Sequence, residues 1–202
     1  IVARMKTTKV LQTNISETNI SEVSKVLNSS TGTRVAICNA NTLVRSTKDP
    51  KVKDLINNFT IKTPDGFPVA KALSLLTKQK FSRVDGYKVF LKTIEDGLDN
   101  DRRHYFFGNN EDTTLLMIDK LNDMFPKIKI VGHICPEFTN GSELVSKYKA
   151  VIEDVNADII WVSLGFPKQE IFIDKLCKEV EISTNFVGVG AVFDWVAGTK
   201  KK

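Results

Sequence analysis

Cysteine and histidine are scarce in this chain, and each shortage excludes a class of protein. The three cysteines, Cys38, Cys135 and Cys177, are odd in number and far apart. They fit free thiols in a reducing cytosol and exclude a disulfide framework. The two histidines, His104 and His133, have no neighbouring ligand residues in the sequence, so we expect no metal site.

Long apolar runs and targeting signals are also missing. No stretch approaches the roughly 20 residues of a membrane-spanning helix, and the first residues do not form a signal peptide. With 42% apolar and 26% charged residues, the composition is typical of a globular protein, and 202 residues suit one domain. We therefore expect a single cytoplasmic domain over residues 1–202, with an N-terminal strand-and-helix appendage over 1–33.

Several well-known motifs do not occur. The chain has no Walker loop, no Gly-x-Gly-x-x-Gly after its first strand and no nucleophile elbow. Asp99-Asn100-Asp101 matches a triplet with which some sugar transferases hold a divalent cation, but it lies in a charged connector, and charge runs are usually solvated. The net charge of +5 suits an anionic partner such as a nucleotide diphosphate, a phospholipid or nucleic acid. No basic and aromatic stripe favours nucleic acid among these.

What is present is an alternation of short β-branched runs with helical segments from Arg34 onward. Continuous apolar strands separated by helices are typical of a parallel sheet covered on both faces. The sequence therefore predicts an α/β fold: a Rossmann-like, doubly wound, mainly parallel sheet with helices on both faces. The expected strands are Met5–Leu11, Arg34–Cys38, His104–Phe107, Ile128–Val131, Asp158–Leu164 and Asn185–Val189. The expected helices are Ile20–Leu27, Pro50–Phe59, Pro68–Thr77, Gly86–Leu98, Thr113–Phe125, Ser142–Val155 and Pro167–Val180.

One carboxylate, Asp65, lies in a short run between two prolines, Thr63-Pro64-Asp65-Gly66-Phe67-Pro68, just before an apolar helix. A stiff turn sets the reach of a carboxylate in advance, which is what a general base requires. The same letters are an ordinary turn signal, because proline presets φ and glycine supplies a positive φ. From these residues alone, Asp65 is either a base or a turn residue.

Glycine directly follows three expected strands, at Gly108, Gly165 and Gly190, and expected helices begin soon after the first two. In open α/β sheets, ligands bind at the carboxyl ends of the strands, where helix N-termini offer free N–H groups to phosphate. Ordinary loop geometry explains the same glycines, so each junction has a functional and a structural interpretation.

Polar side chains near these junctions are equally open. Lys168 directs its charge either at a bound phosphate or at water, and Arg83 is either a ligand contact or a solvated loop arginine. Asn39 either lines a cleft or caps a helix. Pro167 suits the first turn of a helix, and Glu170 in that turn complements the positive end of the helix.

Taken together, these segments resemble the WecG/TagA/CpsF family of bacterial glycosyltransferases. Each motif is weak alone, but five in family order, over roughly residues 34–200, form a strong signal. The matching stretches are Thr63-Pro64-Asp65-Gly66, Arg83-Val84-Asp85-Gly86, Tyr105-Phe106-Phe107-Gly108, Leu-Gly-Phe-Pro-Lys-Gln-Glu at 164–170 and Val-Gly-Ala-Val-Phe-Asp-Trp-Val-Ala-Gly at 189–198.

The resemblance implies transfer of a sugar from a UDP-sugar to an undecaprenyl-diphosphate-linked saccharide, without a cofactor, at the inner face of the bacterial plasma membrane. The products serve teichoic acid, common antigen or exopolysaccharide synthesis, and the sugar is N-acetylmannosamine, its uronic acid, glucose or glucuronic acid. It also implies that Asp65 is the catalytic base. The residues expected to bind substrate are Asn39, Thr63, Arg83, Gly108, Gly165, Pro167, Lys168, Gln169, Gly190 and Asp194.

The chemistry of such a transfer agrees with an inverting reaction that needs no metal. A base takes the proton of the acceptor hydroxyl, and helix N-termini and positive side chains stabilise the leaving diphosphate. Family members usually continue beyond the last residue of this chain with helices expected to contact the membrane, so we expect weak binding or slow turnover. The alternatives are a non-catalytic nucleotide-sugar-binding module with a structural Asp65, and a nucleic-acid binder. Self-association stays open.

Overall fold

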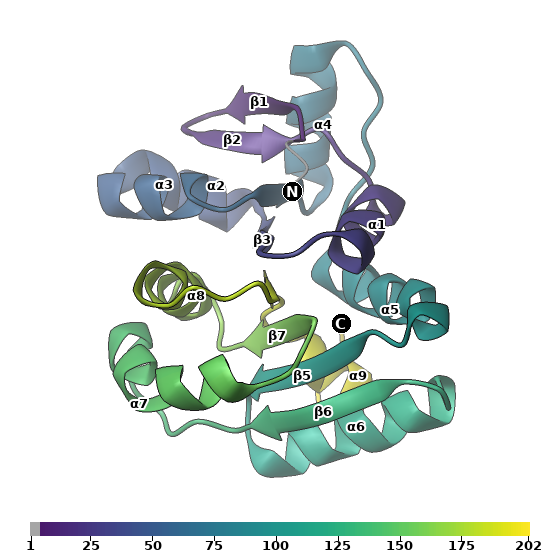
Figure 1. Cartoon of the computed structure of the whole chain (residues 1–202). Helices are drawn as coiled ribbons and strands as arrows, with labels where there is room; N and C mark the ends of the chain where they lie inside the picture. The colour runs from purple at the N-terminus through teal and green to yellow at the C-terminus, as the bar shows by residue number, and fades with distance from the viewer. Residues whose placement is uncertain (1–4) are drawn as a thin grey trace.

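A six-stranded parallel sheet forms the centre of the molecule, with strand order β4-β3-β8-β7-β5-β6. The computed structural model describes residues 5–202; residues 1–4, with which the expected appendage begins, lie outside the described residues. The strands are β3 (Arg34–Cys38), β4 (Ile61–Pro64), β5 (Arg103–Gly108), β6 (Lys129–Ile134), β7 (Ile159–Ser163) and β8 (Asn185–Gly188). β4 and β6 are the two outer strands of this sheet, and Figure 1 shows β7, β5 and β6 side by side.

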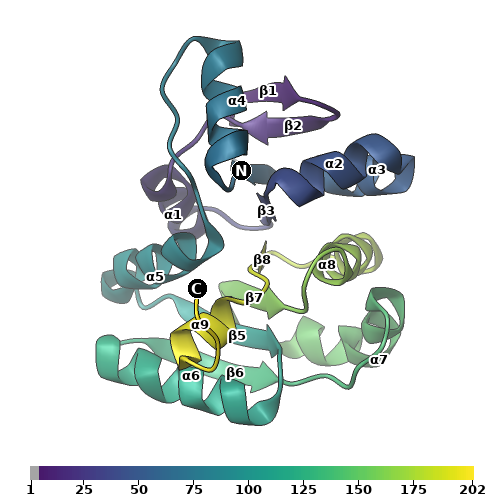
Figure 2. The ribbon, with the colours of Figure 1, turned by 180° about the vertical axis from the view of Figure 1, so that it is seen from behind.

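Helices cover both faces of this sheet (Figure 2). One buried cluster joins the sheet to α2, α3, α4, α7 and α8, and a second joins its other face to α1, α5, α6 and α9. The helices are α1 (Ile20–Ser29), α2 (Ala40–Lys48), α3 (Pro50–Asn57), α4 (Phe67–Thr77), α5 (Gly86–Gly97), α6 (Glu111–Met124), α7 (Gly141–Asp154), α8 (Lys168–Glu179) and α9 (Val192–Ala197). The expected doubly wound α/β fold is confirmed.

Successive side chains of the central strands alternate between the two clusters, as the pleat requires. On β5, Tyr105 and Phe107 face the first cluster and Phe106 faces the second. Trp161 of β7 also faces the second cluster, and its indole Nε1 donates a hydrogen bond to His104 Nδ1 over 3.1 Å. Burial lowers the pKa of His104 to about 4, so this histidine is a neutral core residue.

The N-terminal segment forms a two-stranded antiparallel hairpin, β1 (Thr7–Val10) and β2 (Thr13–Ser16), followed by α1. The expected strand Met5–Leu11 and helix Ile20–Leu27 are confirmed. β2 was not expected, because its sequence Thr-Asn-Ile-Ser is polar. Its Ser16 hydroxyl accepts a hydrogen bond from the Lys62 N–H over 3.1 Å, which places the hairpin beside β4.

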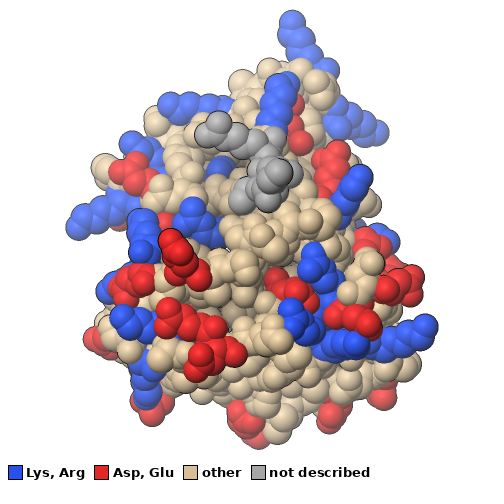
Figure 3. Space-filling model, viewed as in Figure 1, with Lys and Arg blue, Asp and Glu red and all other residues tan. Residues whose placement is uncertain are grey.

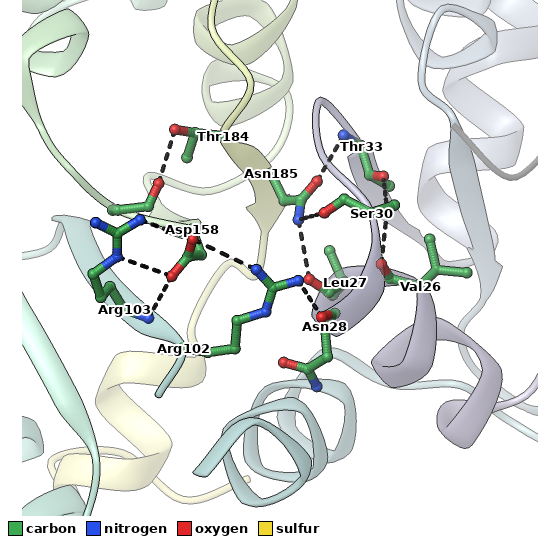
Figure 4. Close-up of polar contacts among 11 residues, drawn as sticks. Val26, Leu27, Asn28, Ser30, Thr33, Arg102, Arg103, Asp158, Thr184 and Asn185 are labelled. Carbon is green, nitrogen blue, oxygen red and sulfur yellow. Dashed lines mark hydrogen bonds and ion pairs between the residues drawn. The ribbon is translucent and has the colours of Figure 1, made fainter. Parts of the chain in front are cut away.

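A network of polar groups ties α1 to the amino ends of the central strands (Figure 4). The buried Asn185 amide accepts a hydrogen bond from Thr33 N–H over 2.8 Å and donates to the carbonyls of Leu27 and Ser30. Nearby, Arg103 forms a two-point ion pair with Asp158. Every polar group of the Asn185 amide is thus satisfied away from water, which fixes where α1 sits on the sheet.

Three further elements were not expected from the sequence, and each has a short or polar sequence. The interpretation of Thr63-Pro64 as part of a turn was wrong, because both residues end the edge strand β4, where Pro64 is tolerated. Helix α2 has a polar, β-branched sequence and depends on its cap, Asn39. Helix α9 has six residues within the expected glycine-rich junction. Among residues 5–202, no helix has both the length and the apolar character needed to cross a bilayer.

Candidate functional site

Because all six central strands run the same way, their carboxyl ends meet at one edge of the sheet. The junction glycines singled out from the sequence lie here, at the end of β5 and after β7 and β8, and Asp65 follows β4. The triplet at 99–101 lies at the amino end of β5 instead, where Asp101 pairs with Lys129 over 2.8 Å. The structure thus gathers most of the expected site at one edge and leaves that triplet outside it.

Asp65 is held at its backbone and at its carboxylate. Its N–H donates to the Cys38 carbonyl at the end of β3 over 3.0 Å, and Gly66 then turns the chain into α4 with a φ of 84°. Arg83 Nε donates to Asp65 Oδ1 over 2.8 Å. The Asp65 side chain is 15% exposed, so the carboxylate is positioned in advance but open on one side.

Arg83 connects Asp65 to a second carboxylate, Asp85, which caps the start of α5. The Arg83 Nε lies 3.9 Å from Asp85 Oδ2, and Lys202 Nζ lies 3.1 Å from Asp85 Oδ1. Burial alone would raise the pKa of Asp85, but hydrogen bonds from Lys202 and the Lys88 N–H, together with nearby positive charges, hold it below its usual value. Acidic and basic side chains therefore alternate here, in the order Asp65, Arg83, Asp85 and Lys202.

A cavity of about 600 Å³ opens above β5, β7 and β8. It contains four of the residues expected from the sequence: Gly165, Lys168, Gly190 and Asp194. Sequence reasoning missed its other polar lining residues, Asn109, Asn110, Ser163, Glu137 and Lys200. The signal for two of these was present, since Asn109 and Asn110 directly follow Gly108.

Backbone contacts behind the cavity are unusually close. Asn109 N–H donates to the Ser163 carbonyl over 3.0 Å, and the Ser163 hydroxyl donates to the Gly190 carbonyl over 2.6 Å. At Gly108, where φ is 128°, a Cβ atom would lie 2.3 Å from the Ser163 oxygen. Glycine is therefore required at Gly108 for β5 and β7 to meet in this way.

Charged groups of both signs face the cavity. Asp194 accepts a hydrogen bond from Asn109 Nδ2 over 3.1 Å and forms an ion pair with Lys200 over 3.0 Å. The Lys168 ammonium lies 4.3 Å from the ring centroid of Phe138. Lys168 and Lys200 thus bring two positive charges to a cavity whose rim also includes the N-terminal turn of α8.

Gln169 lies behind the cavity and supports it. Its Oε1 accepts a hydrogen bond from Gly190 N–H over 3.0 Å, and its Nε2 donates to Glu170 Oε1 over 2.9 Å. The expectation that Glu170 serves the positive end of α8 as a charge needs correction. Glu170 is 1% exposed, and burial raises its pKa to about 7, so near neutral pH a large share of it is uncharged.

This burial predicts a pH dependence of stability. Because the pKa of Glu170 is higher in the folded chain than the usual 4.5, the folded state binds the extra proton, and the stability contributed by Glu170 falls as the pH rises from 4.5 to about 7. The fall is about 3 kcal/mol for such a shift. The lowered pKa of His104 acts in the opposite direction between about 4 and 6.5, so the Glu170 component is measured as the difference between the urea unfolding free energies of the wild type and a Glu170 variant across this pH range. Glu170→Gln should remove this component, whereas Glu153→Gln, at an exposed site on α7, should keep it; equal profiles for both variants would contradict this account.

The other expected residues lie near the edge but outside the cavity lining. Asn39 caps α2 by accepting a hydrogen bond from Thr42 N–H over 3.1 Å. Thr63 is fully buried in β4, and its hydroxyl has no hydrogen-bond partner among the described residues. Pro167 is the N-cap residue of α8 and faces a hollow shared with α2 and α3. Their side chains shape the edge of the sheet.

The expectation that neither histidine has neighbouring ligand residues needs correction for His133. Its Nε2 lies 2.9 Å from Glu111 Oε1, and the donor atoms of Glu111, His133 and Cys135 all lie within 4.8 Å of one another. Such a nitrogen, sulfur and oxygen set suits Zn²⁺ better than Mg²⁺. The cluster lies at α6 and β6, and Asp65 follows β4. Because β6 and β4 are the two outer strands on opposite sides of the sheet, a metal held by this cluster would not reach Asp65.

Comparisons with known proteins place this geometry in a family. The family model of the glycosyl transferase WecG/TagA/CpsF family matches residues 8–202. A Bacillus subtilis (strain 168) protein named N-acetylglucosaminyldiphosphoundecaprenol N-acetyl-beta-D-mannosaminyltransferase is 26% identical over 171 residues, which are 85% of this chain and 65% of that protein. A protein of the same name from Bacillus spizizenii (strain ATCC 23059 / NRRL B-14472 / W23) is 25% identical over 176 residues, covering 87% and 66%. The chain thus spans less than two thirds of the length of these relatives, and it belongs to the WecG/TagA/CpsF family of glycosyl transferases.

Proposed function

We propose that this chain transfers N-acetylmannosamine from a UDP-sugar to N-acetylglucosamine linked through a diphosphate to undecaprenol. The family and the names of the two relatives support this acceptor and this sugar above the other three sugars allowed by the sequence. The observation that carries the proposal is the placement of Asp65. Its carboxylate is fixed by Arg83 at the same edge of the sheet as a cavity with two lysines.

In this proposal the UDP-sugar occupies the cavity, and Asp65 is the base. Asp65 takes the proton of the acceptor hydroxyl while that oxygen forms a bond to the anomeric carbon, and the bond from that carbon to UDP breaks. One displacement inverts the anomeric configuration. β4 is two strands from β8, about 10 Å at the usual strand spacing, which leaves room for a sugar between the diphosphate and Asp65.

The leaving diphosphate gains negative charge, and the proposal assigns its stabilisation to groups of the cavity. Lys168 and Lys200 supply positive charge, and the N-terminal end of α8 adds the partial positive charge of the helix dipole. A transfer built in this way is independent of metal. Since the acceptor is lipid-linked, we also propose that the chain works at the inner face of the bacterial plasma membrane as a peripheral protein.

Binding and transfer, measured separately, test this proposal. UDP and UDP-N-acetylmannosamine should each raise the thermal unfolding midpoint, because a ligand that binds the native state stabilises it. Incubation with N-acetylglucosaminyl-diphosphate-prenol should then yield the disaccharide lipid, also in the presence of a chelator. Stabilisation by UDP without any product would favour the non-catalytic binding module, and no response to any UDP-sugar would reject both.

A further inference from the structure

Helix α4 starts directly after Asp65 and Gly66, and it separates two hollows on the surface. The first, which we call the cationic hollow, lies between α4 and the segment 78–83 that follows it and has a volume of about 770 Å³. Its lining includes four positive side chains and no acidic one: Lys71, Lys78, Lys80 and Arg83. Figure 3 shows basic side chains projecting from the end of the molecule where α4 lies.

Three of these four charges have no acidic partner. Among the ion pairs of residues 5–202, none involves Lys71, Lys78 or Lys80, and all three side chains are exposed. The fourth, Arg83, is the residue that holds Asp65. A concave surface with one sign of charge attracts an anion and concentrates it, and here the lining of the hollow includes Arg83, the partner of the proposed base.

The cationic hollow is a built feature of the fold. The Ser74 hydroxyl on α4 accepts a hydrogen bond from Phe81 N–H over 2.9 Å and donates to the Ala70 carbonyl over 2.7 Å. Val84 N–H donates to the Pro64 carbonyl over 3.0 Å, which ties the end of the same segment to β4. The segment that carries Lys78 and Lys80 is therefore held against α4 at Phe81 and against β4 at Val84.

The second hollow, which we call the apolar groove, lies on the other side of α4, against α2 and β1, and has a volume of about 580 Å³. Lys9 is its one charged lining residue among those described. Leu75 borders both hollows, and the exposed fractions are 67% for Leu75, 59% for Leu76 and 76% for Phe67. Large exposed apolar side chains grouped in this way mark a binding surface.

We infer that α4 is the acceptor-binding surface, with the acceptor diphosphate in the cationic hollow and its prenyl chain along the apolar groove. This inference rests on the proposed function and adds the location of one substrate. A lipid diphosphate needs positive charge and apolar surface side by side, next to the base that takes its sugar's proton. Helix α4 offers both along its 11 residues, about 16 Å of helix. The donor cavity lies over β5, β7 and β8, so the two substrates approach Asp65 from different sides.

Charge reversal tests the diphosphate part. The double variant Lys78→Glu/Lys80→Glu should bind short-chain N-acetylglucosaminyl-diphosphate-prenol at least about tenfold more weakly, and its affinity for UDP should stay unchanged. Lys25→Glu/Lys127→Glu is the matched control, since both lysines are exposed, unpaired among the described residues and on α1 and the connection before β6. Equal losses in the two double variants would overturn the inference.

Removal of apolar surface tests the lipid part. Leu75→Ser/Leu76→Ser should weaken binding of the prenylated probe and leave binding of the same head group without prenyl unchanged. Equal weakening of both probes would overturn this part of the inference. An altered oligomeric state with unaltered probe binding would also overturn it, because it would show that a second copy of the chain covers the groove. If vesicles of anionic phospholipid compete fully with the probe, the surface binds membranes in general and the inference fails. Probe binding requires no turnover, so these outcomes stand apart from a failure of sugar transfer.

Discussion

Asp65→Asn is expected to abolish most sugar transfer while UDP still binds. Asparagine has nearly the same shape and can accept the hydrogen bond from Arg83 Nε that Asp65 Oδ1 accepts over 2.8 Å. It cannot take a proton from the acceptor hydroxyl. General base catalysis contributes on the order of 10² to 10⁴ in rate, so kcat should fall by about that factor. Steady-state kinetics with saturating donor and acceptor measure the loss.

The unchanged UDP affinity distinguishes a lost base from a damaged site. Asp65 follows β4, whereas the cavity lies over β5, β7 and β8, so its neutralisation should alter the UDP-induced thermal shift little. Asp54→Asn removes the same charge at a site 71% exposed and should keep full activity. Wild-type kcat in Asp65→Asn would return Asp65 to the structural role that the turn sequence also allows.

Gly108→Ala is expected to be the most destabilising single change at the site, at about 4 kcal/mol or more. The added Cβ would lie 2.3 Å from the oxygen, 2.6 Å from the carbon and 2.9 Å from the nitrogen of Ser163, all backbone atoms that cannot turn aside. Its φ of 128° is also unfavourable for alanine. Urea unfolding of the variant measures the loss of stability.

Gly165→Ala is the matched control for this prediction. Gly165 also follows a strand and has a positive φ, 77°, but a Cβ there meets nothing within 4 Å. Gly165→Ala should therefore lower the free energy of unfolding only through its unfavourable backbone conformation, by about 1–2 kcal/mol. Equal destabilisation by the two substitutions would mean that backbone conformation, and not the close approach of β5 and β7, requires glycine at Gly108.

The sequence predicted the fold well where side-chain patterns are strong. The buried strands and long helices have periodic apolar residues, and two of the three junction glycines, Gly165 and Gly190, line the cavity. Polar or short elements escaped, because β4 contains Lys62 and Pro64, and α2 depends on the Asn39 cap. Local patterns do not show which distant residues meet, so neither the cluster around His133 nor the Asp85–Lys202 pair was predictable.

The position of β8 has a consequence for how the protein is made. β8 pairs with β3 on one side and β7 on the other, and no other pairing joins β3 and β4 to the remaining strands of the described sheet. It is also the last strand in chain order. As long as β8 is unpaired, no strand pairing joins the part of the described sheet that ends at Asp65 to the part formed by β5, β6 and β7. The sheet can therefore become continuous only after the chain has been synthesised as far as β8, and only then do Asp65 and the cavity over β5, β7 and β8 belong to one sheet.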